Sequence, residues 1–161
     1  DELADLLQAD LLGLADEVVL TAGWQAETVD EALALAAALR DAGKTVSVVG
    51  IAAFNDMTSL SMMLGRLQQP VEAFLFANLR GRFVEINDTL ATGVAGLEGV
   101  RFLDKLALFC DREAGRCDML DAAGRLPIFD ASHLTLGGLA MFGDRIHAQG
   151  WFRLAATASE G

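Results

Sequence analysis

Apolar residues recur along the chain in two patterns, one typical of strands and one typical of helices. Two short runs rich in β-branched residues predict strands at Glu17–Ala22 and Thr45–Ile51, and the short segment Val100–Leu103 has a length that fits another parallel strand. The second run is apolar on both faces, as in a central parallel strand buried between helices. Helical composition predicts helices at Leu3–Leu12, Thr28–Arg40, Met57–Gln68, Val71–Ala95 and Thr135–Gln149.

The order of these elements determines the predicted fold. Thr28 and Glu31 fit a capping box, in which a hydroxyl and a carboxylate bind the free N–H groups of a helix start, and Gly43 stops this helix. Residues 17–51 therefore form a predicted βαβ unit. The alternation continues, so we expect an α/β fold, a three-layer α/β/α sandwich with a mostly parallel sheet. The chain has 161 residues, 53% of them hydrophobic, and no internal repeat, which predicts one domain over residues 1–161.

Ligands of such a sheet bind at the carboxyl ends of its strands. Trp24 follows the first predicted strand and Phe54 follows the second. Each aromatic side chain either lines a pocket at this edge or packs in the core, and Trp24 is the candidate for a pocket residue. No Gly-x-Gly-x-x-Gly phosphate loop occurs, which argues against nucleotide binding, and no cofactor is expected.

Charge is distributed unevenly along the chain. The formal net charge is −11, which repels nucleic acid and anionic lipid, so the sequence predicts no nucleic-acid partner. Residues 1–39 contain nine acidic residues and no Lys or Arg, so this part faces water or a basic partner. The most apolar segment, Thr45–Asn55, has 11 residues, fewer than the roughly 18–20 that a membrane span requires.

One of the two histidines lies in a segment suited to acid–base chemistry. His133 precedes the last predicted helix, and Asp130 lies three residues before it. In a turn, the Asp130 carboxylate can accept the imidazole N–H, fix the tautomer and stabilise the imidazolium. In the alternative interpretation, Asp130 caps the helix and His133 is an ordinary first-turn residue. His147 lies near the end of that helix, where a cation is favourable, and is interpreted as structural.

A nucleophile for this Asp/His pair is missing. Neither Gly-Asp-Ser nor Gly-x-Ser-x-Gly occurs. Ser47 lies within a predicted strand, and Ser132 is adjacent to His133, a poor geometry for proton transfer between them. The remaining serines lie in a predicted helix or in the tail: Ser59, Ser61 and Ser159. None of the serines is expected to act as the nucleophile.

The two cysteines, Cys110 and Cys117, enclose six residues that include Gly115. This spacing allows a disulfide that closes a small loop, and a disulfide would suit an exported protein. Two free buried thiols and a zinc site are the alternatives. Zinc is disfavoured because no second cysteine pair occurs and His133 is not at a usual ligand spacing, so no metal is expected.

The order of motifs in the C-terminal third resembles a known family. The chain contains Phe102-Leu103-Asp104, then the two cysteines, then Asp130-Ala131-Ser132-His133-Leu134-Thr135 with Gly138 behind it. This order resembles SGNH-type hydrolase domains, most closely those fused to membrane O-acyltransferases of the O-antigen acetylase type. Asp16–Trp24 and Lys44–Ile51 resemble two core strands of the same family. The resemblance spans roughly residues 14–148 and is tight over 100–140.

The resemblance implies a serine esterase or O-acetyltransferase that acts on acyl esters of cell-surface polysaccharide. It assigns His133 as the base, Asp130 as the carboxylate that orients it, and Cys110 with Cys117 as a disulfide. The Gly-Asp-Ser block of the family would precede Asp1, so we expect the chain to be the C-terminal portion of a longer protein. The implied partners are an acyl donor, a carbohydrate acceptor and a membrane acyltransferase domain. The implied location is periplasmic or extracytoplasmic, tethered to the inner membrane.

Departures from the family leave other functions open. The oxyanion Asn has no clear counterpart, because Gly23-Trp24 stands where it would fall and Asn55-Asp56 comes one loop too late. The missing serine allows a non-catalytic carbohydrate-binding or scaffolding relative. An unrelated cytosolic flavodoxin-like domain is a third alternative, for which both cysteines would be free thiols.

Overall fold

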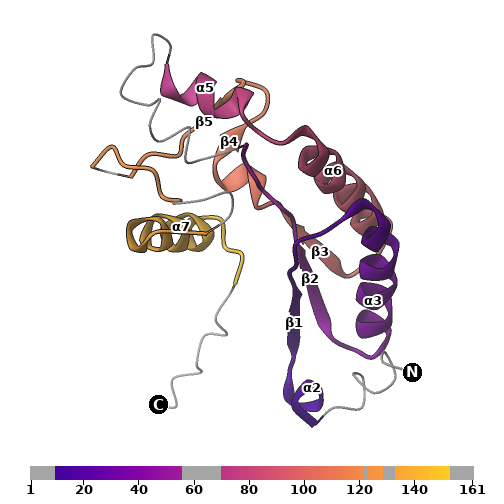
Figure 1. Ribbon diagram of the computed structural model, residues 1–161. Helices are drawn as coiled ribbons and strands as arrows, with labels where there is room; N and C mark the ends of the chain where they lie inside the picture. Colours follow the sequence, from indigo (N-terminus) through magenta and orange to yellow (C-terminus); the bar gives the residue numbers. More distant parts are fainter. Residues whose placement is uncertain (1–9, 56–69, 122, 129–132, 153–161) are drawn as a thin grey trace, which may run out of the picture. The chain divides into compact units, whose positions relative to one another are not determined.

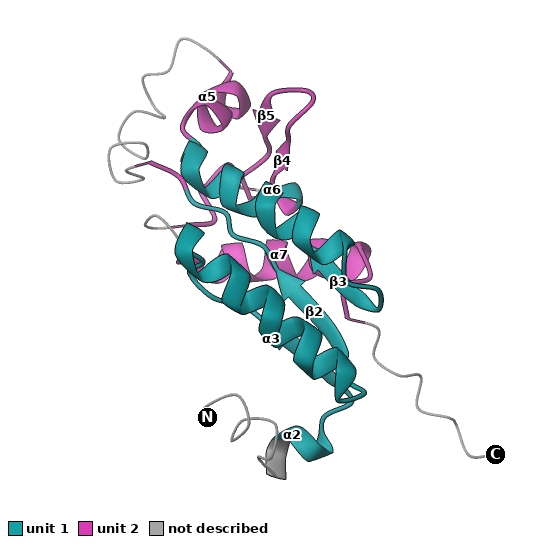
Figure 2. Cartoon of the chain, turned by 90° about the vertical axis from the view of Figure 1, so that its right-hand side faces the viewer, with its two compact units in different colours: residues 1–53, 79–107 teal, residues 54–78, 108–161 magenta. Residues whose placement is uncertain are grey.

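Strands and helices alternate along the chain in the computed structural model, which describes residues 10–55, 70–121, 123–128 and 133–152. The chain divides into two units, coloured teal and magenta in Figure 2. Unit 1 consists of residues 1–53 and 79–107, and unit 2 consists of residues 54–78 and 108–161. Among the described residues, no helix is long and apolar enough to cross a membrane.

A parallel sheet forms the centre of unit 1. Its strands are β1 (Glu17–Leu20), β2 (Thr45–Val49) and β3 (Val100–Leu103), which pair in the order β1-β2-β3. Val46 of β2 lies in register with Val18 on one side and Val100 on the other. These strands lie within the three predicted strand segments, and the predicted α/β fold with a mostly parallel sheet is confirmed.

Two helices, α3 (Val29–Asp41) and α6 (Gly81–Ala95), cover one face of this sheet (Figure 1). Successive strand residues point to opposite faces, so every second residue of each strand meets these helices. The strand residues of this core are Val18, Leu20, Val46, Val48, Val100 and Phe102. The buried helix residues opposite them include Ala32, Ala36, Leu39, Phe83, Ile86, Leu90 and Val94.

The opposite face of the sheet carries a polar network. Ser47 of β2 is fully buried, and its hydroxyl donates to Glu17 Oε1 of β1 at 3.2 Å. A guanidinium N–H of Arg101 on β3 donates to both the Ser47 hydroxyl and the Glu17 carboxylate. A buried hydroxyl is tolerated when it is hydrogen-bonded, so these side chains link all three strands at the end where the strands begin.

Unit 2 contains helices and a short antiparallel hairpin. They are α5 (Val71–Ala77), the two-residue strands β4 (Cys110–Asp111) and β5 (Arg116–Cys117), which form an antiparallel hairpin, and α7 (Leu136–Ala148). Helix α5 packs beside this hairpin, and its Phe76 ring lies near Gly115.

The described residues also form three short helical elements outside the units' main helices: α2 (Asp10–Leu14), η1 (Ala26–Thr28) and η2 (Leu106–Leu108).

Two predicted helix features differ from the structure. The capping box at Thr28 does not form, because this residue ends η1 and its hydroxyl donates to the Gln25 carbonyl at 3.1 Å. The helical segment Val71–Ala95 is interrupted after α5, where the Asn78 amide donates to the Phe74 carbonyl at 2.9 Å. The predicted helix Met57–Gln68 and most of the predicted helix Leu3–Leu12 lie outside the described residues.

Candidate active site

Trp24 packs in the core of unit 1, just after β1. Its side chain is 9% exposed, and its indole N–H donates to the carbonyl of Val49, the last residue of β2, at 2.7 Å. An indole N–H finds such a partner when the ring is buried. Of the two interpretations of Trp24, its burial fits the core residue, and the pocket role stays a prediction.

A cavity of about 370 Å³ lies in unit 1, beside the loop that follows β1. Its apolar floor includes Val29 and Ile86, which are buried. The rim presents carboxylates, an amide, a hydroxyl and a guanidinium. The lining residues are Gln25, Ala26, Glu27, Val29, Arg82, Glu85, Ile86 and Thr89. Such a rim offers hydrogen-bond donors and acceptors of the kind that sugar hydroxyls require.

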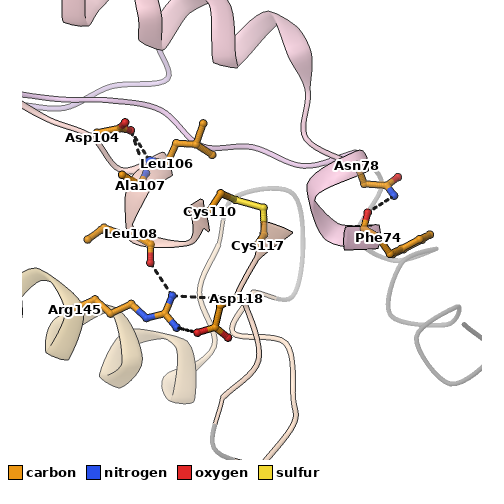
Figure 3. The surroundings of a disulfide bond; sticks show 10 residues. All are labelled: Phe74, Asn78, Asp104, Leu106, Ala107, Leu108, Cys110, Cys117, Asp118 and Arg145. Carbon is orange, nitrogen blue, oxygen red and sulfur yellow. Dashed lines mark hydrogen bonds and ion pairs between the residues drawn. A yellow bond between two sulfur atoms is a disulfide. The ribbon is translucent and has the colours of Figure 1, made fainter. Parts of the chain in front are cut away.

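In unit 2, Cys110 and Cys117 form the disulfide that their spacing allows and the family resemblance implies (Figure 3). The two residues face each other across the β4–β5 hairpin, and both are buried. The Asp111 carboxylate accepts the N–H of Ala114 at 2.9 Å and so holds the turn between the strands. The alternatives of free thiols and of a zinc site at these cysteines are therefore wrong.

Arg145 of α7 binds the chain on both sides of this hairpin. Its guanidinium donates to the carbonyl of Leu108 at 2.7 Å and to the carbonyl of Asp118 at 2.8 Å (Figure 3). It also forms an ion pair with the Asp118 carboxylate at 2.8 Å. Charge-assisted hydrogen bonds of this kind are the stronger ones, so one side chain fixes α7 against the ends of the disulfide loop.

His133 lies two residues before the N-cap of α7, and its side chain is exposed. Leu134 forms an isolated antiparallel bridge with Ile128. Thr135, the N-cap residue, donates its backbone N–H to the carbonyl of Pro127 at 2.8 Å. The backbone immediately after His133 is thus held by hydrogen bonds, and functional side chains are positioned best on such a supported backbone.

The start of α7 requires glycine at its third residue. The Gly138 N–H donates to the Thr135 hydroxyl at 3.0 Å, and a Cβ at this glycine would lie 1.9 Å from the Pro127 carbonyl oxygen. Because Thr135 is the N-cap, the alternative interpretation that Asp130 caps the helix and His133 lies in its first turn is wrong. Asp130 itself lies outside the described residues, so its pairing with His133 stays a prediction.

A second cavity, of about 340 Å³, lies in unit 2 beside the start of α7. Its lining residues are Asp121, Arg125, Leu126, Thr135, Leu136 and Gly137. The Asp121 carboxylate accepts the backbone N–H of Arg125 and also pairs with its guanidinium at 2.9 Å. The backbone hydrogen bond from Arg125 is the main reason that the pKa of Asp121 lies below its usual value.

Ser47 is the one serine among the described residues, and it is engaged in the polar network of the sheet. Ser59, Ser61, Ser132 and Ser159 lie outside them. Within the described part of the chain, no group of three His, Cys, Asp or Glu residues could hold a metal ion.

Two polar networks escaped prediction from the sequence. One joins Glu17, Ser47 and Arg101. Each of the three predicted strands contains one of these polar residues, but only the strand register shows that they lie side by side. The other joins Asn87 of α6 to Asp104, the residue after β3. Its signal is an amide on the apolar face of a helix, a position where burial requires hydrogen-bond partners.

Comparison with known proteins identifies a family. No curated protein and no solved structure is significantly similar to this chain. A family model described as "SGNH domain (fused to AT3 domains)" matches residues 2–148, a stretch that includes all the elements described above. This family performs hydrolase and acyltransferase chemistry. The chain therefore belongs to the family of SGNH domains that are fused to AT3 domains.

Proposed function

We propose that this chain supplies the general base and its orienting carboxylate to a serine esterase or O-acetyltransferase that acts on acyl esters of cell-surface polysaccharide. The observation that carries the proposal is the Asp130-x-x-His133 segment in a chain of this family, with His133 directly before the anchored start of α7. The nucleophilic serine belongs to a segment outside these 161 residues.

In the proposed reaction, the serine hydroxyl attacks the ester carbonyl carbon, and the imidazole of His133 accepts its proton. Asp130 accepts the other imidazole N–H and stabilises the imidazolium. The imidazolium then donates its proton to the departing alcohol oxygen, which leaves an acyl-serine. An acceptor hydroxyl, or water, next attacks the acyl group and gives its proton to His133, which returns it to the serine oxygen.

The carbohydrate is proposed to bind in the cavity of unit 1. The cavity lies beside the loop that follows the carboxyl end of β1, where ligands of parallel sheets bind. Its rim carries Glu27, Glu85 and Thr89, whose oxygen atoms accept hydrogen bonds from sugar hydroxyls.

The proposed location is extracytoplasmic, with a membrane acyltransferase domain as partner. The disulfide between Cys110 and Cys117 supports an oxidising compartment. The family description supports the partner, because these SGNH domains are fused to AT3 domains. The acidic residues at the start of the chain would suit a basic surface on that partner.

A serine-directed fluorophosphonate probe and an acetyl-ester assay on the full-length natural protein test the proposal. The probe is expected to label one serine outside residues 1–161. His133→Ala should lower turnover by about 10³-fold or more, and Asp130→Asn somewhat less, because each removes part of the proton-transfer machinery. His147→Ala, at the exposed end of α7, is the matched control and should leave turnover unchanged.

Full activity in His133→Ala would contradict the assignment of the base. The second candidate function, a non-catalytic carbohydrate-binding or scaffolding relative, is favoured by the absence of a usable serine among the described residues. It predicts no labelled serine, and glycan affinity that His133→Ala leaves unchanged.

A further inference from the structure

An asparagine interrupts the apolar face of α6. Asn87 is 2% exposed, and its neighbours on the same helix face, Phe83, Ile86 and Leu90, belong to the core of unit 1. Asn is a poor residue for a helix interior, and a buried amide is costly unless its donors and acceptor are bonded. Its presence therefore needs an explanation in its hydrogen bonds.

The amide of Asn87 bonds to both segments that leave the carboxyl ends of β2 and β3. Its Oδ1 accepts the N–H of Ile51, two residues after β2, at 2.7 Å. Its Nδ2 donates to Oδ1 of Asp104, the residue after β3, at 2.9 Å. The approach is close because Gly50 has no side chain: a Cβ there would lie 2.4 Å from the amide oxygen.

Asp104 passes this constraint to the turn that follows β3. The same Oδ1 atom accepts the N–H of Leu106 at 2.9 Å and the N–H of Ala107 at 3.2 Å (Figure 3). These two hydrogen bonds hold the start of η2. One amide thus fixes the loop after β2 and the turn after β3 relative to each other.

We infer that Asn87 is a positioning residue for the acyl-transfer reaction, acting through Ile51 and Asp104. The inference rests on the proposed function. It follows from the place of the network, because the carboxyl ends of parallel strands are where such folds bind and convert ligands. Misplacement of site elements by about 1 Å can reduce a rate by about 100-fold. The hydrogen bonds by which Asn87 joins the two loops at the carboxyl ends of β2 and β3 should therefore affect turnover and not folding alone.

The charged groups around position 87 define a sharp test. Asp104 is the ionisable group that contacts the amide. Asp88, the next residue of α6, is exposed, and Lys105 is half-buried, with burial lowering its pKa. A second carboxyl placed at position 87 would lie within hydrogen-bond distance of the Asp104 carboxylate.

The first variant is Asn87→Asp in the full-length protein, assayed with an acetyl ester. A protonated carboxyl at position 87 still donates to Asp104, whereas an ionised one repels it. Burial and the neighbouring carboxylate both raise the pKa of the new group above the ordinary value of about 4. We expect kcat within about threefold of wild type at pH 5.5 and at least about 10-fold lower at pH 8.5, with KM unchanged.

The second variant exchanges the two groups, Asn87→Asp with Asp104→Asn. The exchange again places one amide against one carboxylate, so kcat at pH 8.5 should return to within about threefold of wild type. Circular dichroism melts at both pH values establish the folded fraction of each variant. Because Asn87→Asp keeps its hydrogen bonds at pH 5.5, a jump to pH 8.5 tests the inference even if the exchanged protein does not fold.

The outcomes separate positioning from stability. A kcat per folded molecule that equals wild type at both pH values would overturn the inference, and so would a loss at pH 8.5 in a folded double variant. An inactive, unlabelled wild-type protein would overturn the proposed function and this inference with it. An active wild type with an unaffected Asn87→Asp would overturn the inference alone.

Discussion

In unit 1, two helices cover one face of a parallel sheet, whereas in unit 2 a short hairpin and its neighbouring segments are joined by a disulfide and by side chains that bind backbone carbonyls. The core of unit 1 is formed by residues spaced at strand and helix periods. In unit 2, Arg145 and Thr135 each bind carbonyls distant in sequence. An aromatic pair, Phe109 and Phe142, packs edge to face with ring centroids 4.1 Å apart.

This difference indicates where each unit tolerates change. Apolar burial depends on area and volume, so outside the polar networks of Ser47 and Asn87 the stability of unit 1 should respond chiefly to lost side-chain volume. Hydrogen bonds and disulfides depend on individual atoms. The stability of unit 2 should therefore respond to single-atom changes at a few positions. The candidate base, His133, lies in the unit that depends on individual atoms.

Leu90→Ala should have the largest effect on stability. Leu90 is fully buried in the core of unit 1, and the truncation should lower the free energy of unfolding of that unit by about 3–4 kcal/mol. Leu136→Ala in unit 2 is the control, because that side chain is 86% exposed. Hydrogen exchange of β2 amides measures the loss. A change below about 1 kcal/mol would contradict the idea that packing stabilises unit 1.

Gly138→Ala should destabilise unit 2 by about 3 kcal/mol, because the added methyl would overlap the Pro127 carbonyl. Its control lies in the same helix. A Cβ at Gly143 meets nothing within 4 Å, so Gly143→Ala should stabilise α7 by about 0.5–1 kcal/mol through helix propensity. Thermal melts of both variants test the pair, and equal shifts of the two melting temperatures would refute the comparison.

The double substitution Cys110→Ser/Cys117→Ser should lower the stability of unit 2 by about 2.5 kcal/mol, the value expected for so short a loop. Exchange of the amides from Cys110 to Asp118 should accelerate, while that of β2 stays at its wild-type rate. Reduction of the wild-type protein with dithiothreitol should give the same pattern. Equal acceleration in both units would show that the disulfide stabilises the whole chain.

The smallest effect concerns Asp121. Because its folded-state pKa is lowered, chiefly by the Arg125 N–H, its contribution to stability is complete above the unfolded value of about 4. That contribution is lost as the pH falls below 4 toward the folded-state pKa. Asp121→Asn should remove this acid-side dependence, which a chemical-shift titration of the Arg125 amide would follow. A titration of the wild-type carboxyl at its ordinary pKa would contradict it.

The sequence was most informative where one period dominates. The predicted strand segments match the three strands of the parallel sheet, although the first two end earlier than expected, at Leu20 and Val49. The two-residue strands β4 and β5 were not predicted, because two residues carry no periodic pattern. The predicted capping box at Thr28 was wrong because the Thr28 hydroxyl bonds to the Gln25 carbonyl in the preceding turn instead of to an N–H group of the helix. The motif alone does not show which of these partners the hydroxyl reaches. Asn87 could be recognised as unusual on its helix face, but its partners depend on a register that no local pattern contains.

For the candidate site, cysteine spacing and family resemblance together predicted the disulfide. This prediction was possible because a disulfide requires only that two cysteines come within bonding distance, and a short loop brings them there. The resemblance also predicted the Asp130 and His133 pair, which still requires the activity test. The anchoring of the segment after His133 through Thr135 and Pro127 was beyond the sequence, because it joins carbonyl and N–H groups that every residue carries.

The contact between Gly50 and Asn87 also has a consequence for the history of the family. Position 50 has room for hydrogen only, because the amide oxygen of Asn87 and the ring of Phe102 occupy the place of a Cβ. Mutations at positions 50 and 87 are therefore not independent events. Relatives that keep the amide must keep glycine, and a relative with a side chain at position 50 needs a smaller residue at position 87 and a displaced ring at position 102. Positions 50 and 87 should therefore covary.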